Sequence, residues 1–169
     1  MDERVWTDEP LTIEESLQVG DSKISLVSNP AFAYFVTGNL EKVMPKLGLG
    51  KNSLGFGSDR KGAENFAVRI NRNTILAIVN EQMQSGWNEG GFAVSEASDA
   101  YMPIKISGPQ MAQILAQCGI ADIDQASSSA ATLFAGVTSL VIRNKGACEV
   151  WVPAAYLTYV SSYLRGVTL

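Results

Sequence analysis

The stretch "IKISGPQMAQIL", from Ile104 to Leu115, predicts a short apolar strand that becomes a helix within two residues. Pro109 suits the first helical position, because its missing N–H group costs nothing there. Gly119 is a natural end for the helix. One predicted helical face, with i, i+3, i+4, i+7 spacing, consists of Met111, Ile114, Leu115 and Cys118. The stretch therefore predicts a strand-to-helix joint with a buried helix face.

Around this joint, most of the chain has strand patterns separated by turn residues. Two predicted hairpins have turns at 71–73 and at Asn144-Lys145-Gly146. An extended stretch over 91–107 is interrupted near Ser98-Asp99, and Asn29-Pro30 is a turn pair. The other predicted strands are "SKISLVS" (22–28), "AFAYFVTG" (31–38), "FAVRI" (66–70), "TILAIV" (74–79), "TLFAGVTSLVIR" (132–143) and "ACEVWVP" (147–153).

Further helices are predicted at both ends of the chain and between the strands. Asn39 is a candidate N-cap for a helix over 40–48, in which Pro45 should cause a kink or an early end. Thr12 and Glu15 fit a capping box that would open a brief helix through Leu17. Residues 80–91 are expected to form a short helix or a loop. The last helix should have one face made of Tyr156, Leu157, Val160 and Leu164.

The order of these elements repeats along the chain. Residues 31–88 and residues 100–165 both follow the order strand, helix, strand, strand, helix. We therefore expect an α+β fold of two fused ferredoxin-like βαββα units, with an antiparallel or mixed sheet and helices packed on it. The 169 residues are expected to form a single domain with a short N-terminal extension over 1–21.

Composition excludes several classes of function. The net charge of −4 and the pI near 4.8 argue against a nucleic-acid surface. The acidic N-terminus has no apolar signal segment and no run could span a membrane, so we expect a cytoplasmic protein without membrane contact. Since histidine is absent, His-based catalysis and most zinc and iron sites are not expected. Cys118 and Cys148 are expected to be buried structural thiols.

Two stretches could bind phosphate or another anion, and each has a simpler interpretation. "PKLGLGKN" (45–52) resembles a phosphate loop, but Pro45 replaces its first glycine and Asn52 its hydroxyl residue. We interpret its glycines as part of a long loop over 48–62. The Ser107-Gly108-Pro109 joint could present helix N–H groups to an anion, but a plain turn with Ser107 as N-cap is favoured.

Other candidate site residues are charged or aromatic. The acidic ones are expected to be exposed turn residues, and the arginines could meet an anionic ligand but are expected to be solvated. The tryptophans are expected to serve packing or an interface. These candidates are Glu96, Asp99, Asp122 and Asp124; Arg60, Arg69 and Arg143; and Trp87 and Trp151.

Three stretches together resemble the gamma subunit of heterotetrameric sarcosine oxidase. They are "GFAVSEASDAYMPIKISGPQMAQILAQCGIADI" (91–123), "TLFAGVTSLVIR" (132–143) and "EVWVPAAYLTYVSSYL" (149–164). "NLEKVMPKLGLG" (39–50) also resembles a helix and loop of this family, so the resemblance extends from Ala31 to Leu164. It implies the folate-binding fold shared with the glycine-cleavage T-protein, or aminomethyltransferase, family.

The chain departs from the family pattern at three places. Residues 71–76 lack the proline and tryptophan of the family hairpin, and Pro153-Ala154 replaces an Arg-Ser pair before the last helix. The stretch Thr138-Ser139-Leu140 has no carboxylate where aminomethyltransferases use one for the methylene group. This third departure argues against one-carbon transfer by this chain.

The resemblance implies a noncatalytic accessory subunit of a sarcosine-oxidase-like oxidoreductase acting on an N-methyl amine or amino acid. The chain itself would hold no cofactor and no catalytic or metal-binding residue, and the larger partner subunits would carry the flavins and the dinucleotide. One alternative is a free-standing tetrahydrofolate-binding or aminomethyltransferase-like protein of one-carbon metabolism. Another is a homo-oligomeric interaction module.

Overall fold

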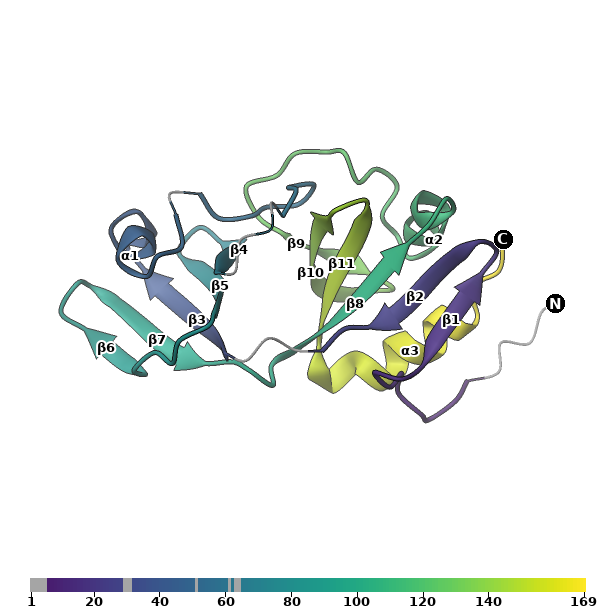
Figure 1. Cartoon of the computed structure of the whole chain (residues 1–169), viewed down its shortest axis with the longest axis horizontal. Coiled ribbons are helices and arrows are strands. Elements are labelled where there is room, and N and C mark those ends of the chain that lie inside the picture. The colour runs from purple at the N-terminus through teal and green to yellow at the C-terminus, as the bar shows by residue number, and fades with distance from the viewer. Residues whose placement is uncertain (1–5, 29–31, 51, 61, 63–64) are drawn as a thin grey trace.

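The computed structural model, which describes residues 6–28, 32–50, 52–60, 62 and 65–169, has the α+β fold predicted from the sequence. Figure 1 shows two antiparallel sheets and the helices α1 (Leu40–Lys46), α2 (Met111–Gln117) and α3 (Leu157–Arg165). The larger sheet has the order β1 (Ser16–Val19), β2 (Ser22–Leu26), β8 (Tyr101–Ser107), β11 (Ala147–Pro153), β10 (Val137–Asn144), β9 (Ala131–Phe134). The smaller sheet has the order β4 (Phe66–Asn71), β5 (Thr74–Val79), β3 (Phe32–Gly38), β7 (Phe92–Glu96), β6 (Gly86–Asn88).

The predicted repeat is visible in the strand order. In the first half, β3 precedes α1 and pairs with β5, the second strand of the hairpin that follows α1. In the second half, β8 precedes α2 and pairs with β11, the second strand of the hairpin that follows α2. The smaller sheet thus contains the order β4-β5-β3-β7, and the larger sheet contains the matching order β10-β11-β8-β2. The two halves are therefore related in topology as well as in element order.

Each sheet is covered by helices on one face and meets the other sheet with its opposite face. In β5, Ile75 and Ala77 belong to the cluster under α1, whereas Leu76 and Ile78 belong to a cluster shared with the larger sheet. The larger sheet contributes Trp151, among others, to that shared cluster, and its other face packs on α2 and α3. Strands buried on both faces explain why the stretches "TILAIV" and "SLVI" are almost continuously apolar.

The joint after β8 is architectural. Gly108 has a φ of +112°, and a Cβ atom there would lie 2.6 Å from the Ser22 Oγ atom. The Gln110 N–H donates to Ser22 Oγ (2.8 Å), and the Asp21 N–H donates to Gln110 Oε1 (3.1 Å). These contacts fix the start of α2 against the turn between β1 and β2. The α2 face is confirmed, since Ile114, Leu115 and Cys118 are buried.

The predicted helix start at this joint is wrong in two details. Ser107 is the last residue of β8, and the N-cap position belongs to Gln110, whose side chain does not cap the helix. Pro109 consequently lies in the turn before the helix. The close contact between Gly108 and Ser22 gives the reason, because the chain must turn for two more residues before it can enter α2. Gly119, with a φ of +93°, ends the helix as predicted.

The predictions for α1 and for the two hairpins are confirmed. The Asn39 side chain accepts a hydrogen bond from the Lys42 N–H (3.4 Å), and the helix ends one residue after Pro45. The second hairpin turns through Lys145 (φ +48°) and Gly146 (φ +78°), as two-residue hairpin loops require. Asn29-Pro30, the other predicted turn, lies outside the described residues.

Two further segments differ from the sequence prediction. Residues 132–143 do not form one strand, because Ala135 and Gly136 turn the chain between β9 and β10. Residues 80–91 form β6 and its flanking turns instead of a helix, since Gly86 has a φ of +123° and β6 pairs with β7. In both segments a glycine in the left-handed region decides the path of the chain.

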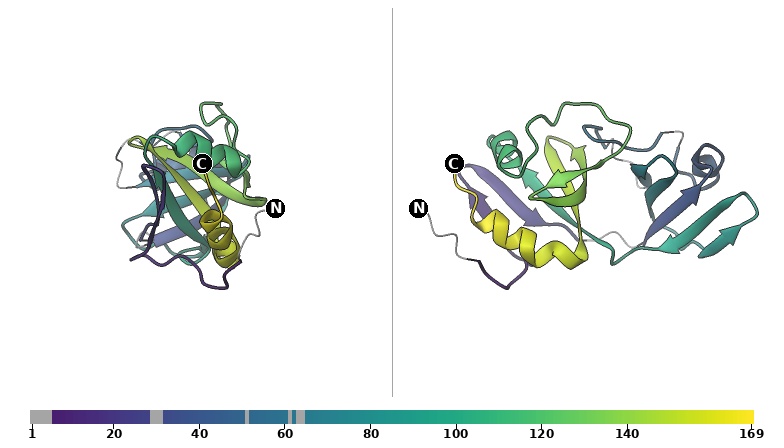
Figure 2. Two further views of the ribbon diagram at one scale, coloured as in Figure 1. Left: turned by 90° about the vertical axis from the view of Figure 1, so that its right-hand side faces the viewer. Right: turned by 180° about the vertical axis from the view of Figure 1, so that it is seen from behind.

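The predicted capping-box helix at Thr12 is also absent. Residues 12–15 form a single turn, in which the Glu15 N–H donates to the Thr12 carbonyl (3.1 Å), and β1 follows at once. The Glu15 carboxylate binds Arg165 of α3 instead of capping a helix. Figures 1 and 2 show residues 6–15 running beside α3, and Leu11 in this segment is 2% exposed.

Within the described residues, the longest helix is α3, and no helix has the length and apolar character needed to cross a membrane.

Candidate functional site

A pocket of about 570 Å³ lies where the loop after α1 bridges the two sheets. Leu54 pairs with the edge of β4, and the Arg60 N–H donates to the Arg143 carbonyl of β10 (2.9 Å). Gly55 lies so close to the 127–128 backbone that a Cβ atom there would be 1.9 Å from the Ser127 carbonyl oxygen. The pocket is lined by residues 49, 52–54, 57–60, 65–67 and 143.

One wall of the pocket contains Arg60, which pairs with a buried carboxylate outside the pocket. The Arg60 guanidinium lies 4.0 Å from the centre of the Phe66 ring, and its Nη1 atom lies 3.5 Å from the Glu149 carboxylate. Glu149 is only 4% exposed and also accepts hydrogen bonds from the Asn144 amide and from Trp151 Nε1 (3.4 Å). The buried negative charge is therefore balanced by a cation and two neutral donors.

A second, smaller pocket of about 200 Å³ shares Arg60 and Phe66 with the first. The stacked pair therefore separates two hollows between the sheets. Glu149 and Trp151 line only the smaller one. An aromatic ring, a guanidinium and a buried carboxylate together could hold a planar ligand with both donors and acceptors.

Arg143 forms the opposite wall of the larger pocket. Its Nε atom donates to the Gly57 carbonyl (2.9 Å), and its Nη1 atom forms an ion pair with Asp124 (2.7 Å). Asp59 lies 3.6 Å from the same guanidinium. Both carboxylates are more than half exposed, so solvent screens these ion pairs.

The structure brings together only some of the residues singled out from the sequence. Arg60 and Arg143 share the pocket, and Asp124 joins them through Arg143. Arg69 instead lines a separate hollow beside α1, where its Nε atom donates to Ser53 Oγ (2.7 Å). All three arginines are partly exposed, and each also has polar partners within the chain.

The acidic residues are exposed, as expected. Glu96 ends β7, Asp99 follows in the turn before β8, and Asp122 accepts a hydrogen bond from the Asp124 N–H (2.9 Å). In β10, Ser139 is fully buried and donates to the Val137 carbonyl (3.2 Å). The strand that lacks the family carboxylate is therefore packed into the fold at this position.

Cys118 and Cys148 are both buried, as predicted, and neither forms a disulfide. Burial, together with the smaller effect of the neighbouring Glu149, raises the pKa of Cys148 to about 12, and Arg143 opposes the shift. At neutral pH Cys148 is consequently a protonated thiol with little nucleophilic character. Across the described residues, no group of three or more His, Cys, Asp or Glu side chains could hold a metal ion.

The two tryptophans singled out from the sequence have opposite environments. Trp151 is 2% exposed, and its ring meets Phe66 edge-on with the centroids 6.2 Å apart, between the two sheets. Trp87 is 75% exposed on β6, at the edge of the smaller sheet. The expected packing role is therefore filled by Trp151.

The glycines of residues 45–52 act as loop residues. Gly48 has a φ of +67° and follows the last turn of α1, and the Leu49 N–H donates to the Met44 carbonyl (3.0 Å). This is a glycine-terminated helix end. Lys51, the basic residue of the suggested phosphate loop, lies outside the described residues.

A group of exposed aromatic side chains lies at the start of α3. The prediction that Tyr156 shares a helix face with Leu157, Val160 and Leu164 is wrong, because Tyr156 precedes α3 and is exposed. Tyr156 and Tyr159 are 52% and 42% exposed, and Trp6 of the N-terminal segment stacks on Tyr159 with centroids 5.8 Å apart. The signal was present in the sequence, because tyrosines at 156, 159 and 163 have i, i+3, i+7 spacing and form a second helical stripe. The contribution of Trp6 could not be read from that spacing.

No protein-family model matches this chain, and no curated protein matches it in sequence. Among solved structures, it is similar to a chain of heterotetrameric sarcosine oxidase from Corynebacterium sp. U-96, determined in complex with pyrrole 2-carboxylate. The TM-score is 0.61 at 14% identity, over 88% of this chain and 87% of the other. The chain therefore shares its fold with a chain of heterotetrameric sarcosine oxidase, in agreement with the fold that its motifs imply.

Proposed function

We propose that this chain is a noncatalytic accessory subunit of a sarcosine-oxidase-like flavin oxidoreductase complex in the cytoplasm. The complex would act on an N-methyl amine or amino acid, and its larger subunits would carry the flavins and the dinucleotide. The observation that carries the proposal is the extent of the structural match, which covers nearly the same share of both chains. The two chains are therefore similar in length, so the match is between two small proteins rather than with one domain of a large subunit.

The polar groups of the inter-sheet pocket support a noncatalytic role. Arg60 is paired with Glu149, and Arg143 with Asp124 and Asp59. Catalytic acids and bases are often recognised by strongly perturbed pKa values in a cleft. Here the large upward shift belongs to Cys148, a buried residue whose neutral thiol suits a structural role.

The proposal is tested with the isolated chain and with the complex. Purified alone, the chain should neither retain flavin nor release peroxide from sarcosine. Produced together with the larger subunits of a flavin oxidoreductase from the same genome, it should co-purify with them in stoichiometric amounts. Stoichiometric flavin absorbance, or peroxide release by the isolated chain, would overturn the noncatalytic assignment, and failure to join the subunits would overturn the accessory one.

The pocket supports a second candidate, a free-standing tetrahydrofolate-binding protein. Its volume of about 570 Å³ lies within the usual range of small-molecule sites. Phe66 and Arg60 could contact a planar ring and an anionic tail. Titration of tetrahydrofolate into the isolated chain separates the two candidates, since only this one requires saturable binding.

A further inference from the structure

A contiguous aromatic and acidic surface lies along α3, which we call the strap–α3 face. It is defined by Trp6, Asp8, Glu9, Tyr156 and Tyr159. All five side chains are exposed, and the Trp6 and Tyr159 rings are stacked at an interplanar angle of 15°. Large apolar side chains exposed as a group, and not singly, are typical of an interaction surface.

A groove continues this face toward the larger sheet. Its volume is about 430 Å³, and Tyr156 forms one side of it. The Tyr159 hydroxyl donates to the Ala135 carbonyl (3.1 Å), one residue before Gly136 of the groove. Tyr159 thus lies between Trp6 and the groove. The remaining groove residues are Tyr101, Val137, Thr138 and Pro153.

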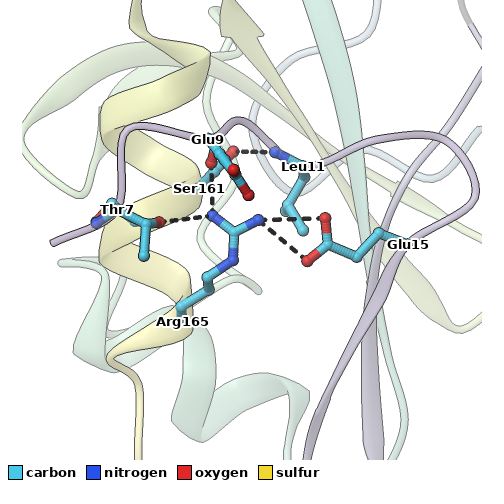
Figure 3. Close-up of polar contacts among 7 residues, drawn as sticks. Thr7, Glu9, Leu11, Glu15, Ser161 and Arg165 are labelled. Carbon is cyan, nitrogen blue, oxygen red and sulfur yellow. Dashed lines mark hydrogen bonds and ion pairs between the residues drawn. The ribbon is translucent and has the colours of Figure 1, made fainter. Parts of the chain in front are cut away.

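The segment that carries Trp6 is fixed in place before any partner binds (Figure 3). The Arg165 guanidinium donates to the Thr7 hydroxyl (3.0 Å) and to the Glu9 carbonyl, and it forms a two-pronged contact with the Glu15 carboxylate. The Leu11 N–H donates to the Ser161 hydroxyl (2.9 Å). A pre-organised surface loses less conformational entropy on association than a mobile one.

The negative charge of the protein is concentrated in this segment. The first 16 residues contain six of the 17 acidic residues and one of the 13 basic ones. The remaining 153 residues therefore hold 11 acids and 12 bases, which nearly balance. Of the six acids, Asp8, Glu9 and Glu14 are exposed in the described part of the segment, and Glu15 pairs with Arg165.

We propose that the strap–α3 face docks onto a larger protein subunit whose matching surface is apolar at its centre and lined by lysine or arginine at its rim. This inference rests on the proposed accessory function and adds the docking face and the chemistry of the partner. Tyrosine and tryptophan are enriched at the centres of protein interfaces, and opposite charges at the rim accelerate association.

The charge of the segment disfavours the other occupants of this face. A second copy related by two-fold symmetry would bring two acidic segments together. Nucleic acid and anionic membranes would likewise be repelled by the carboxylates. A basic protein surface is the occupant that both the charge and the aromatic side chains fit.

Variants of the full chain are compared for binding to the larger subunits of a flavin oxidoreductase from the same genome. Trp6→Ala with Tyr156→Ser should weaken the Kd by about tenfold or more, as loss of central aromatic contacts does. Asp8→Lys with Glu9→Lys should slow association. The association rate of this variant should also depend less on NaCl concentration than the wild-type rate does.

Matched controls are available on the smaller sheet. Trp87→Ala removes a tryptophan that is even more exposed than Trp6. Glu81→Lys with Glu89→Lys makes the same change in charge at exposed positions on other strand connections. Both controls should bind as the wild type does. Circular dichroism and thermal unfolding of each variant exclude a loss of fold as the cause.

The possible results separate the inference from the proposed function. If the wild type joins the subunits and the strap–α3 variants bind equally well, the docking face is wrong and the accessory function stands. The docking face is also wrong if Trp87→Ala weakens binding as much as Trp6→Ala with Tyr156→Ser does. It is likewise wrong if the strap–α3 variants only abolish a homodimer seen by light scattering. A wild-type chain that does not bind these subunits overturns both proposals.

Discussion

The inter-sheet pocket and the strap–α3 face both gather charged and aromatic side chains, but they differ in how those side chains are satisfied. In the pocket, Arg60 stacks on Phe66 and pairs with Glu149, which is almost fully buried. On the face, Trp6 and Tyr156 are each more than half exposed. One region is complete within the chain, and the other leaves apolar area in contact with water.

This difference separates residues that hold the fold together from residues available to a partner. The buried carboxylate of Glu149 requires Arg60 and Asn144, since an unpaired charge in the interior would be costly. No comparable need fixes exposed aromatic residues at a helix surface, where surface substitutions usually change stability little. We therefore expect the charged residues of the pocket to contribute to stability and those of the face to association.

The largest expected effect is the difference in the free energy of unfolding between Trp151→Ala and Trp87→Ala. Trp151→Ala should lower the free energy of unfolding by about 3–5 kcal/mol, because the ring fills the core between the sheets. Trp87→Ala should change it by no more than about 0.5 kcal/mol, as exposed substitutions usually do. Urea denaturation followed by circular dichroism measures both. Similar losses in the two variants would contradict the assignment of interior and surface.

A smaller effect is expected from the charge pair in the pocket. Arg60→Met should cost about 1–3 kcal/mol, because it leaves the buried Glu149 carboxylate without its cation. Arg143→Met is the matched control and should cost about 1 kcal/mol or less, since its ion pairs are exposed. In a double-mutant cycle, Glu149→Gln should remove most of the cost of Arg60→Met. Additive effects would mean that the two side chains are not coupled.

The buried thiol predicts a modest loss of stability at high pH. The pKa of Cys148 is about 12 in the folded chain, against 9.0 for an unperturbed thiol, so the unfolded chain releases the proton first. The contribution of the protonated Cys148 thiol to the free energy of unfolding is fully present below pH 9 and is lost as the pH rises from 9 to 12. The wild type should lose about 1 kcal/mol more than Cys148→Ala between pH 8 and pH 10 in urea denaturation. Parallel pH profiles would contradict the upward shift.

Local patterns in the sequence predicted most of the fold. The start of α1, the face of α2 and the turn at residues 144–146 follow from capping, periodicity and turn chemistry, and all three are confirmed. The prediction failed where a distant partner decides the structure. Glu15 fits a capping box, but Arg165, 150 residues away, binds its carboxylate. Gly108 similarly delays α2, because Ser22 lies against it.

The candidate site was less accessible to sequence reasoning. Arg60 and Arg143 were singled out, but their shared pocket depends on the path of a loop that pairs with β10. Glu149 was not singled out at all, since nothing in the strand "ACEVWVP" shows that its carboxylate faces the other sheet. Sites assembled from several elements need the tertiary fold before their members can be grouped.

The smallest expected effect is the most decisive for function. We predict that tetrahydrofolate titrated into the isolated chain shows no saturable binding tighter than about millimolar, a free energy of only about 4 kcal/mol. The reason is that Arg60 and Arg143 are already paired with carboxylates, so an anionic ligand must displace Glu149, Asp124 or Asp59. Isothermal titration calorimetry measures the constant, and Phe66→Ala, which removes the ring under Arg60, is the matched control. A micromolar constant with one-to-one stoichiometry that Phe66→Ala abolishes would make the pocket a ligand site. The contrast between a self-contained pocket and an open docking face would then be lost, and the folate-binding candidate would replace the accessory subunit.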